Sequence, residues 1–160
     1  MKHKPLKTEI TAIITEFNNV LSGRPWFGRS VYDMLEDVKE SKAGIQPGKE
    51  GHSLIELIWH MNTWARFTYK RLQNSAEDDL ETSEALDWRE IDPSIHTWAV
   101  GVAEFKKINA AIVAKLQTAD DSLLDVTVDF REYNFRFLLN GLIQHNIYHL
   151  GQIAMLTKIL

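Results

Sequence analysis

The chain of 160 residues contains no cysteine. This absence excludes disulfide bonds, a cysteine nucleophile and a zinc site built on thiolates. Any bound metal must therefore rest on nitrogen and oxygen ligands, and any thiol chemistry must use a thiol that a substrate or co-substrate brings. A chain without disulfides suits a reducing compartment, so we expect a cytoplasmic protein.

The sequence also lacks a strong excess of either charge and a long apolar run. Its 18 basic and 22 acidic side chains give a formal net charge of −4, which provides no electrostatic attraction to nucleic acid or to anionic membranes. No apolar stretch approaches the roughly 20 residues that span a bilayer. We therefore expect a small-molecule substrate, with no nucleic acid and no membrane as a partner.

An apolar content of 44% is enough for a single domain, residues 1–160, with a sizeable core. Apolar residues recur at helical spacing in four long segments and one short one, which predicts an all-α four-helix bundle with a short extra helix and long connections. The expected long helices cover about 6–21, 54–72, 93–116 and 137–160. The short helix is expected at 30–38, and the connections 39–51 and 77–92 are expected to be turns and loops.

Two of these helices carry recognisable start signals. Ser53 or His52 is placed to cap the second long helix, and Asp92 followed by Pro93 fits the N-cap and first position of the third. Residues 127–131 alternate like a strand, but one isolated strand cannot form a sheet.

The most informative residues are His145 and His149. Residues four apart project from one face of a helix, so their two imidazoles can hold one metal ion. The same stripe carries apolar residues and therefore faces the core: Leu138, Leu142, Ile153 and Leu156. A desolvated imidazole with an unsatisfied nitrogen costs on the order of 1–3 kcal/mol, which coordination removes. For the pair alone, a satisfied core role remains open.

A catalytic site with nitrogen ligands usually needs a third protein ligand. His60 fits best, because it lies in the middle of the second helix on a face with apolar neighbours. His52 is too far along that helix to share an ion with it, His3 is close to the terminus, and His96 is expected to face solvent from the third helix. The predicted metal ligands are His60, His145 and His149.

Four motifs follow one another in a characteristic order: Pro25-Trp26-Phe27-Gly28, residues 51–64 around His60, Asp87-Trp88, and His145-x3-His149-x2-Gln152. In order and spacing, over nearly the whole chain, they resemble the DinB/YfiT-like superfamily of bacterial helical-bundle proteins. The resemblance implies a four-helix bundle, commonly a homodimer, in which His60, His145 and His149 bind nickel or zinc. Thiol S-transferases and a mycothiol-dependent isomerase belong to that superfamily, which implies a low-molecular-weight thiol as co-substrate.

One position departs from the superfamily pattern. Relatives often carry an arginine directly after the last metal histidine, and this chain has Leu150 there. The departure weakens the case for recognition of an anionic substrate.

Other metal chemistries lack their residues in this sequence. A zincin protease has a glutamate after its first histidine, where this chain has Asn146. Di-iron bundles need Glu-x-x-His motifs, and covalent haem attachment needs cysteines, and neither pattern occurs. A mononuclear three-histidine site remains, able to lower the pKa of a bound water or thiol.

Three functions are compatible with such a site. The first is a metal-dependent transferase that activates a low-molecular-weight thiol or water, the second a metal-dependent hydrolase of a small substrate, and the third a non-catalytic dimeric bundle with a structural or sensory metal.

Two further residues are candidates for catalysis. Gln152 is placed to hydrogen-bond a metal-bound water or a substrate, and Glu56, one turn before His60, is placed to orient that ring.

Aromatic residues are expected mainly in the core. Core packing is favoured over substrate contact for four tryptophans, namely Trp59, Trp64, Trp88 and Trp98. Trp26 and Phe27 either pack a loop onto the bundle or form part of a dimer surface, and the sequence does not distinguish these roles.

Overall fold

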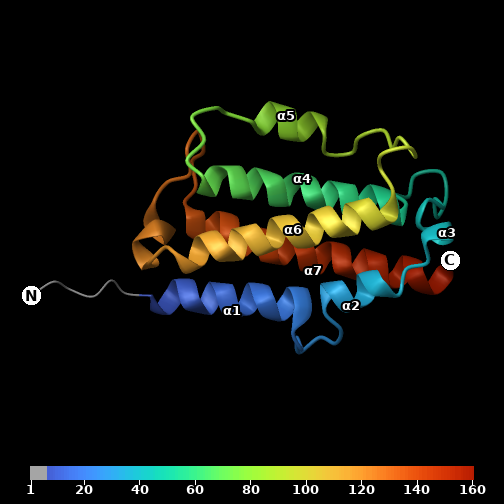
Figure 1. The fold of residues 1–160 in the computed structure, drawn as a ribbon, viewed down its shortest axis with the longest axis horizontal. Helices are drawn as coiled ribbons and strands as arrows, with labels where there is room; N and C mark the ends of the chain where they lie inside the picture. The colour runs from blue at the N-terminus through green and yellow to red at the C-terminus, as the bar shows by residue number, and fades with distance from the viewer. Residues whose placement is uncertain (1–6) are drawn as a thin grey trace, which may run out of the picture.

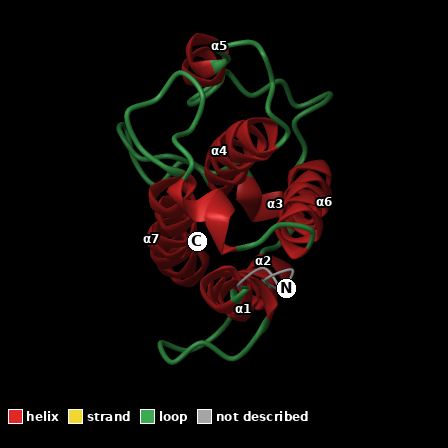
Figure 2. Cartoon of the chain, turned by 90° about the vertical axis from the view of Figure 1, so that its left-hand side faces the viewer, coloured by secondary structure: helices red, strands yellow, loops and turns green. Residues whose placement is uncertain are grey.

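The computed structural model describes residues 7–160, and in this part of the chain four long helices lie side by side (Figure 1). α4 packs against α6 and α7, and α1 packs against the same two helices. Viewed end-on, the four surround a common centre (Figure 2). The predicted all-α four-helix bundle is therefore confirmed. The long helices are α1 (Thr8–Ser22), α4 (Leu54–Leu72), α6 (Trp98–Gln117) and α7 (Phe135–Ile159).

Shorter helices fill the connections. The expected short helix at 30–38 is confirmed as α2, which Ser30 caps by accepting from the backbone N–H of Asp33. The two connections expected as turns and loops each contain a further short helix. Too few residues form these for a helical period to be recognised in the sequence. The short helices are α2 (Val31–Glu36), α3 (Glu40–Ala43), α5 (Leu80–Ala85) and the 3-10 helix η1 (Asp121–Asp125).

The start of α4 follows the prediction. Ser53 accepts a hydrogen bond from the backbone N–H of Glu56, and the Glu56 carboxylate accepts one in return from the backbone N–H of Ser53 at 2.7 Å. This capping box satisfies two N–H groups that the first helical turn would otherwise leave unpaired. It fixes the register of the helix that carries His60.

The predicted start of α6 is wrong. Asp92 does not cap the helix, because its carboxylate accepts from the backbone N–H and the hydroxyl of Ser94 and so closes a local turn. α6 begins at Trp98, and Thr97 is its N-cap. His96 consequently precedes the helix, and its ring packs edge-on against Trp59 with centroids 4.8 Å apart rather than facing solvent.

Other boundaries agree more closely. α1 begins at Thr8, and the predicted first residue, Leu6, lies outside the described residues. Residues 127–131 form no strand, and the only bridge found in the described part of the chain joins Thr127 to Asn134. No helix within residues 7–160 has both the length and the hydropathy that crossing a membrane requires.

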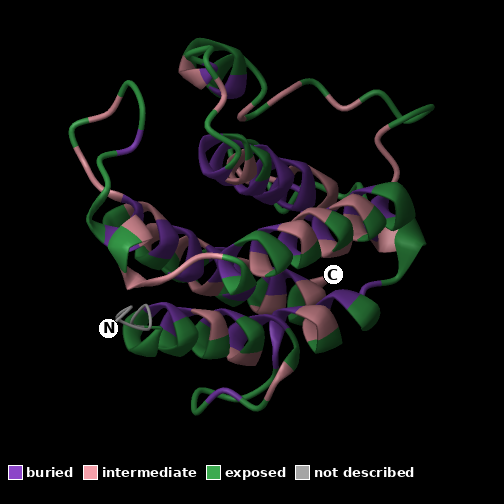
Figure 3. Cartoon of the chain, turned by 60° about the vertical axis from the view of Figure 1, so that its left-hand side comes forward, coloured by how far each residue is buried: buried purple, intermediate pink, exposed green. Residues whose placement is uncertain are grey.

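The core lies between the inward faces of the long helices, whereas α5 and the loops are largely exposed (Figure 3). On α7, Leu142, Ile153 and Leu156 are buried as predicted, and Leu138 is half-buried. α4 is buried on most of its circumference because α5 and the following segment cover its outer side. A helix covered in this way can hold polar side chains out of water.

α4 and α6 are in close contact at Gly101. A Cβ atom added there would lie 2.8 Å from Cγ2 of Ile58 and 3.2 Å from Nε1 of Trp59. The side-chain amide of Asn62 donates to the Gly101 carbonyl at 2.8 Å, which ties the two helices together at this point. Only glycine permits this spacing.

We expect Gly101→Ala to lower the free energy of unfolding by about 1–3 kcal/mol, because the added methyl group overpacks the contact between α4 and α6. The matched control is Gly151→Ala on exposed α7 surface, where an added Cβ meets nothing within 4 Å. That substitution should raise stability by about 0.5–1 kcal/mol through helix propensity. Urea unfolding measures both, and equal effects of the two substitutions would contradict the packing argument.

Candidate metal centre

Three histidine side chains converge in the interior where α4 packs against α7. Nε2 of His60 lies 2.9 Å from Nε2 of His145 and 2.8 Å from Nε2 of His149, and the latter two nitrogens are 3.1 Å apart. His60 and His149 are buried, and His145 is half-buried. The three residues that the sequence singled out therefore form one cluster, which is compatible with metal binding.

The remaining histidines lie elsewhere. The side chain of His52 is 41% exposed at the start of α4, His96 packs on Trp59, and His3 lies outside the described residues. The separation predicted between His52 and His60 along the helix explains why His52 does not reach the cluster.

The size of the cluster fits one transition ion. An imidazole nitrogen binds zinc at about 2.0–2.1 Å, so nitrogens separated by less than about 4 Å can share a single ion. The three Nε2–Nε2 distances, 2.8 to 3.1 Å, lie within that limit. The donor set is three neutral nitrogens, which suits borderline ions of the first transition series.

The opposite ring nitrogens show which tautomers are present. Nδ1 of His60 lies 2.6 Å from the Asp87 carboxylate, and Nδ1 of His149 lies 2.6 Å from Oε1 of Gln152. Both oxygens are acceptors, which favours the tautomers of His60 and His149 with the proton on Nδ1. In these tautomers the Nε2 lone pairs of His60 and His149 face each other at 2.8 Å. Two such lone pairs repel each other unless a cation or a proton donor lies against them.

Burial keeps all three rings neutral. Desolvation, and secondly the proximity of His149, lower the pKa of His60 to about 4, although the contact with Asp87 acts in the opposite direction. Desolvation and the two neighbouring imidazoles lower the pKa of His145 to about 3. The pKa of His149 is also lowered, mainly by desolvation. All three rings are therefore favoured in the neutral form, which is the form that binds a metal.

The structure places Gln152 beside the cluster, whereas Glu56 has a role that differs from the one suggested by the sequence. Gln152 accepts a hydrogen bond from His149 and so orients a ring of the cluster, and its hydrogen bond to a metal-bound water or a substrate stays a prediction. Glu56 does not orient His60, because its carboxylate is engaged by the backbone N–H and hydroxyl of Ser53 in the capping box. Asp87 is the carboxylate that faces His60.

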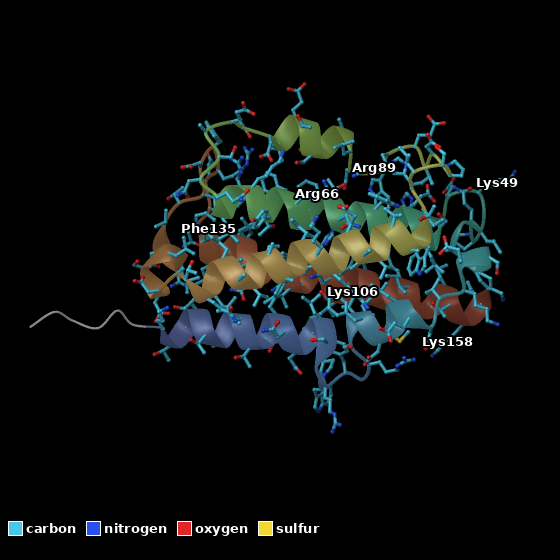
Figure 4. The ribbon with its side chains drawn as sticks, viewed as in Figure 1. Lys49, Arg66, Arg89, Lys106, Phe135 and Lys158 are labelled. Atoms are coloured by element: carbon cyan, nitrogen blue, oxygen red, sulfur yellow. The ribbon has the colours of Figure 1, made fainter. Side chains whose placement is uncertain are left out.

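Sequence reasoning missed the function of Asp87, which lies in the acidic connection after α5. Its position is fixed by contacts with α4. The indole N–H of Trp64 donates to the Asp87 carboxylate at 2.6 Å. Arg89 donates to the Thr63 hydroxyl at 2.5 Å and lies between α4 and α5 (Figure 4). The Asp87-Trp88 pair in the sequence was a signal for this segment, but nothing in the sequence places it over α4.

Trp88 covers the outer face of His60. Its ring is stacked on His60 with centroids 3.9 Å apart and on His52 with centroids 3.6 Å apart, each at an interplanar angle of 9°. Two parallel rings this close to one indole must lie on its opposite faces. Trp88 is thus held between two histidines and screens the cluster from water on that side.

The expectation of core packing holds for only some of the tryptophans. Trp59 and Trp98 are buried, whereas Trp64 is half-buried against Asp87 and Trp88 is 42% exposed. Trp26 is fully exposed, so it does not pack a loop onto the bundle.

The lowered pKa values predict acid lability of the metal-free protein. Below pH 6.5 the histidines of the unfolded chain bind protons, whereas in the folded state His60 and His145 stay unprotonated until the pH is much lower. The unfolding free energy is therefore highest above that pH and falls as the pH approaches 4. We expect thermal unfolding in chelator to show this loss, and the double substitution His60→Gln and His145→Gln to flatten it. Parallel profiles for the two proteins would contradict the assignment.

Comparison with known proteins adds one finding. A family model described as the DinB superfamily matches residues 28–153, a stretch that contains all three clustered histidines as well as Asp87 and Gln152. No curated protein matches the chain. Because this family match covers most of the sequence, the chain belongs to the DinB superfamily.

Proposed function

We propose that this protein is a metal-dependent enzyme of the thiol S-transferase type. His60, His145 and His149 hold one divalent transition ion, nickel or zinc, and leave coordination positions for a low-molecular-weight thiol or water. The observation that carries the proposal is the convergence of the three Nε2 atoms in the interior, with those of His60 and His149 2.8 Å apart. A bound ion would relieve their repulsion and would supply acidity to a coordinated thiol or water at neutral pH.

The neighbouring side chains prepare the site without taking part in bond making. The Asp87 carboxylate lies 2.6 Å from Nδ1 of His60, and Gln152 accepts a hydrogen bond from Nδ1 of His149, and both contacts favour the tautomers whose Nε2 lone pairs point inward. Trp88 excludes water from the face of His60. These contacts hold the cluster in the geometry needed for coordination before any ligand arrives, so little reorganisation is required.

The surroundings favour a thiol over water as the nucleophile. Oδ1 of Asp87 accepts from the indole of Trp64 and also lies 2.6 Å from Nδ1 of His60, so this oxygen is already engaged and is poorly placed to take a proton from water. A thiol would need no such base, because a bound divalent ion would lower its pKa far enough for its proton to pass to solvent. In the transfer, the sulfur lone pair forms a bond to an electrophilic carbon of the substrate, and the leaving group departs with the electrons of the broken bond and takes up a proton.

A non-catalytic role is the second candidate. His60 and His149 are only 6% and 4% exposed, so an ion there would also connect α4 to α7 inside the core. An ion with this role would stabilise the bundle, or report on metal availability, without turnover.

Metal content is the first test. Protein purified without an affinity tag should contain close to one equivalent of nickel or zinc by elemental analysis. His149→Ala should lose this metal while keeping its helical circular dichroism, and His96→Ala, which removes an imidazole outside the cluster, should retain it. Asp87→Asn should weaken binding roughly 10- to 100-fold. Stoichiometric metal in His149→Ala would overturn the proposal.

Turnover separates the candidate functions. The metal-loaded protein is assayed with low-molecular-weight thiols and electrophilic acceptors, and with ester substrates, each with and without chelator. Thiol transfer that chelator abolishes supports the transferase, and metal-dependent ester cleavage without transfer indicates a hydrolase. A large loss of melting temperature in chelator, with no turnover in either assay, would favour the non-catalytic role.

The proposal includes a homodimer. The loop between α1 and α2 projects from the bundle (Figure 1) and carries Trp26, which is fully exposed, and Phe27, which is 47% exposed. Adjacent exposed aromatic residues commonly mark an interaction surface. Sedimentation analysis should show a dimer for the wild type and a shift toward monomer for Trp26→Ser. A monomeric wild type would contradict this part of the proposal.

A further inference from the structure

A small cleft between α4 and α7 opens directly beside the histidine cluster. Its volume is about 200 Å³, and it reaches His145, which forms part of its wall. A larger cavity of about 930 Å³ lies near Trp88, but none of the three clustered histidines lines it. The small cleft is therefore the one through which a bound molecule meets the reactive centre.

The lining of this cleft is largely apolar and rich in aromatic residues. Trp64 and Phe67 come from α4, Phe137 comes from α7, and Tyr133 comes from the segment just before α7. The lining contains no acidic residue, lysine or arginine. Its one aliphatic hydroxyl, that of Thr68, already donates to the backbone carbonyl of Trp64 at 2.9 Å. The aromatic walls offer contact area and no charge for an ion to pair with.

Two guanidinium groups beside the cleft are already paired with carboxylates. The guanidinium groups of Arg71 and Arg131 lie over the ring of Phe67, 5.8 and 5.7 Å from its centroid. Arg71 forms a salt bridge with Asp79 at 2.7 Å, and Arg131 pairs with Asp78. An anionic group entering the cleft would therefore lose its water without gaining a free cation.

Gly141 leaves room for the cleft because it has no side chain. It lies inside α7, one turn before His145, and a Cβ atom added there would meet nothing within 4 Å. Glycine inside a helix costs roughly 0.5–1 kcal/mol relative to alanine, and here no close helix contact requires it, in contrast to Gly101. Phe137, one turn before Gly141 on α7, also lines the cleft and is 66% exposed, with its ring 5.2 Å from that of Tyr133. A bound apolar group would cover this exposed ring.

We propose that the cleft binds a neutral apolar group of the substrate, about the size of a phenyl ring, and holds it against His145 while the reacting group lies at the histidine cluster. The inference rests on the proposed function and names the substrate class of the same site. The volume of the cleft suits a phenyl group, because an apolar protein cavity of about 150 Å³ accommodates benzene. The substrate class is a small uncharged compound with an aryl or short branched alkyl group next to its reactive carbon.

Binding of benzyl alcohol to the purified protein tests the cleft without any reaction. In amide NMR spectra, benzyl alcohol should shift the signals of Phe67 and Gly141 in a saturable way. Gly141→Leu, which fills the cleft, should weaken this binding at least about 10-fold. Asn140→Leu adds the same side chain at an exposed neighbouring position outside the cleft, and it should bind like the wild type. Unaltered binding in Gly141→Leu would overturn the proposal.

Cobalt-loaded protein tests the link to the metal centre. Thiol coordination is followed by its charge-transfer absorption, and phenylmethanethiol is compared with 2-sulfanylethanol. The wild type should bind phenylmethanethiol roughly 10- to 100-fold more tightly, and Gly141→Leu should lose this preference while still binding cobalt and 2-sulfanylethanol. Phe137→Ala provides a second variant at an exposed position, and its preference should fall several-fold.

The two proposals fail in different ways. Equal affinity of the wild type for the two thiols, or an undiminished preference in Gly141→Leu and Phe137→Ala, overturns the substrate class and leaves the metal site standing. Failure of the wild type to bind cobalt overturns the proposed function itself, and the cobalt titration reveals this before any thiol is added.

Discussion

The Nε2 atoms of His60 and His149 face each other at 2.8 Å inside this bundle, and the properties of the site depend on that contact. Oxygen atoms of Asp87 and Gln152 lie 2.6 Å from the opposite nitrogens of the two rings, which favours a lone pair on each Nε2. Unsatisfied polar atoms in a protein interior cost on the order of 1–3 kcal/mol each. The cluster of three imidazoles is compatible with binding of a cation, which would satisfy these nitrogens.

A small number of packing contacts in the bundle bring His60 and His149 together. The capping box at Ser53 sets the register of α4, and packing of α4 against α7 brings His60 opposite the pair on α7. The segment after α5 then covers the outer side of α4 and places Asp87 and Trp88 against His60. The site is consequently dry on one side and open on the other, where the apolar cleft meets His145. A site of this shape suits a reaction that needs a neutral organic substrate beside an activated nucleophile.

The sequence predicted the long helices and the three clustered histidines because both depend on local periodicity. Apolar spacing identified the inward faces, and His60, His145 and His149 lie on those faces. Asp87 was missed because its role depends on how a connection folds back over α4, which no local pattern specifies. The start of α6 was misplaced because an aspartate before a proline is equally able to cap a helix or to close a turn with Ser94. Glu56 was assigned to His60 on helical spacing alone. Its carboxylate instead accepts hydrogen bonds at the start of the helix, where backbone N–H groups have no partner within the helix.

The most direct test of the central claim is X-ray absorption spectroscopy at the edge of whichever metal the untagged protein carries. The account predicts a single mononuclear site with three imidazole nitrogens, at about 2.0–2.1 Å if the metal is zinc, and at least one further light ligand. The same spectrum from protein saturated with a thiol should show one sulfur ligand in addition to the three imidazoles. A metal bound by fewer than three imidazoles, or protein that takes up no divalent metal at all, would contradict it.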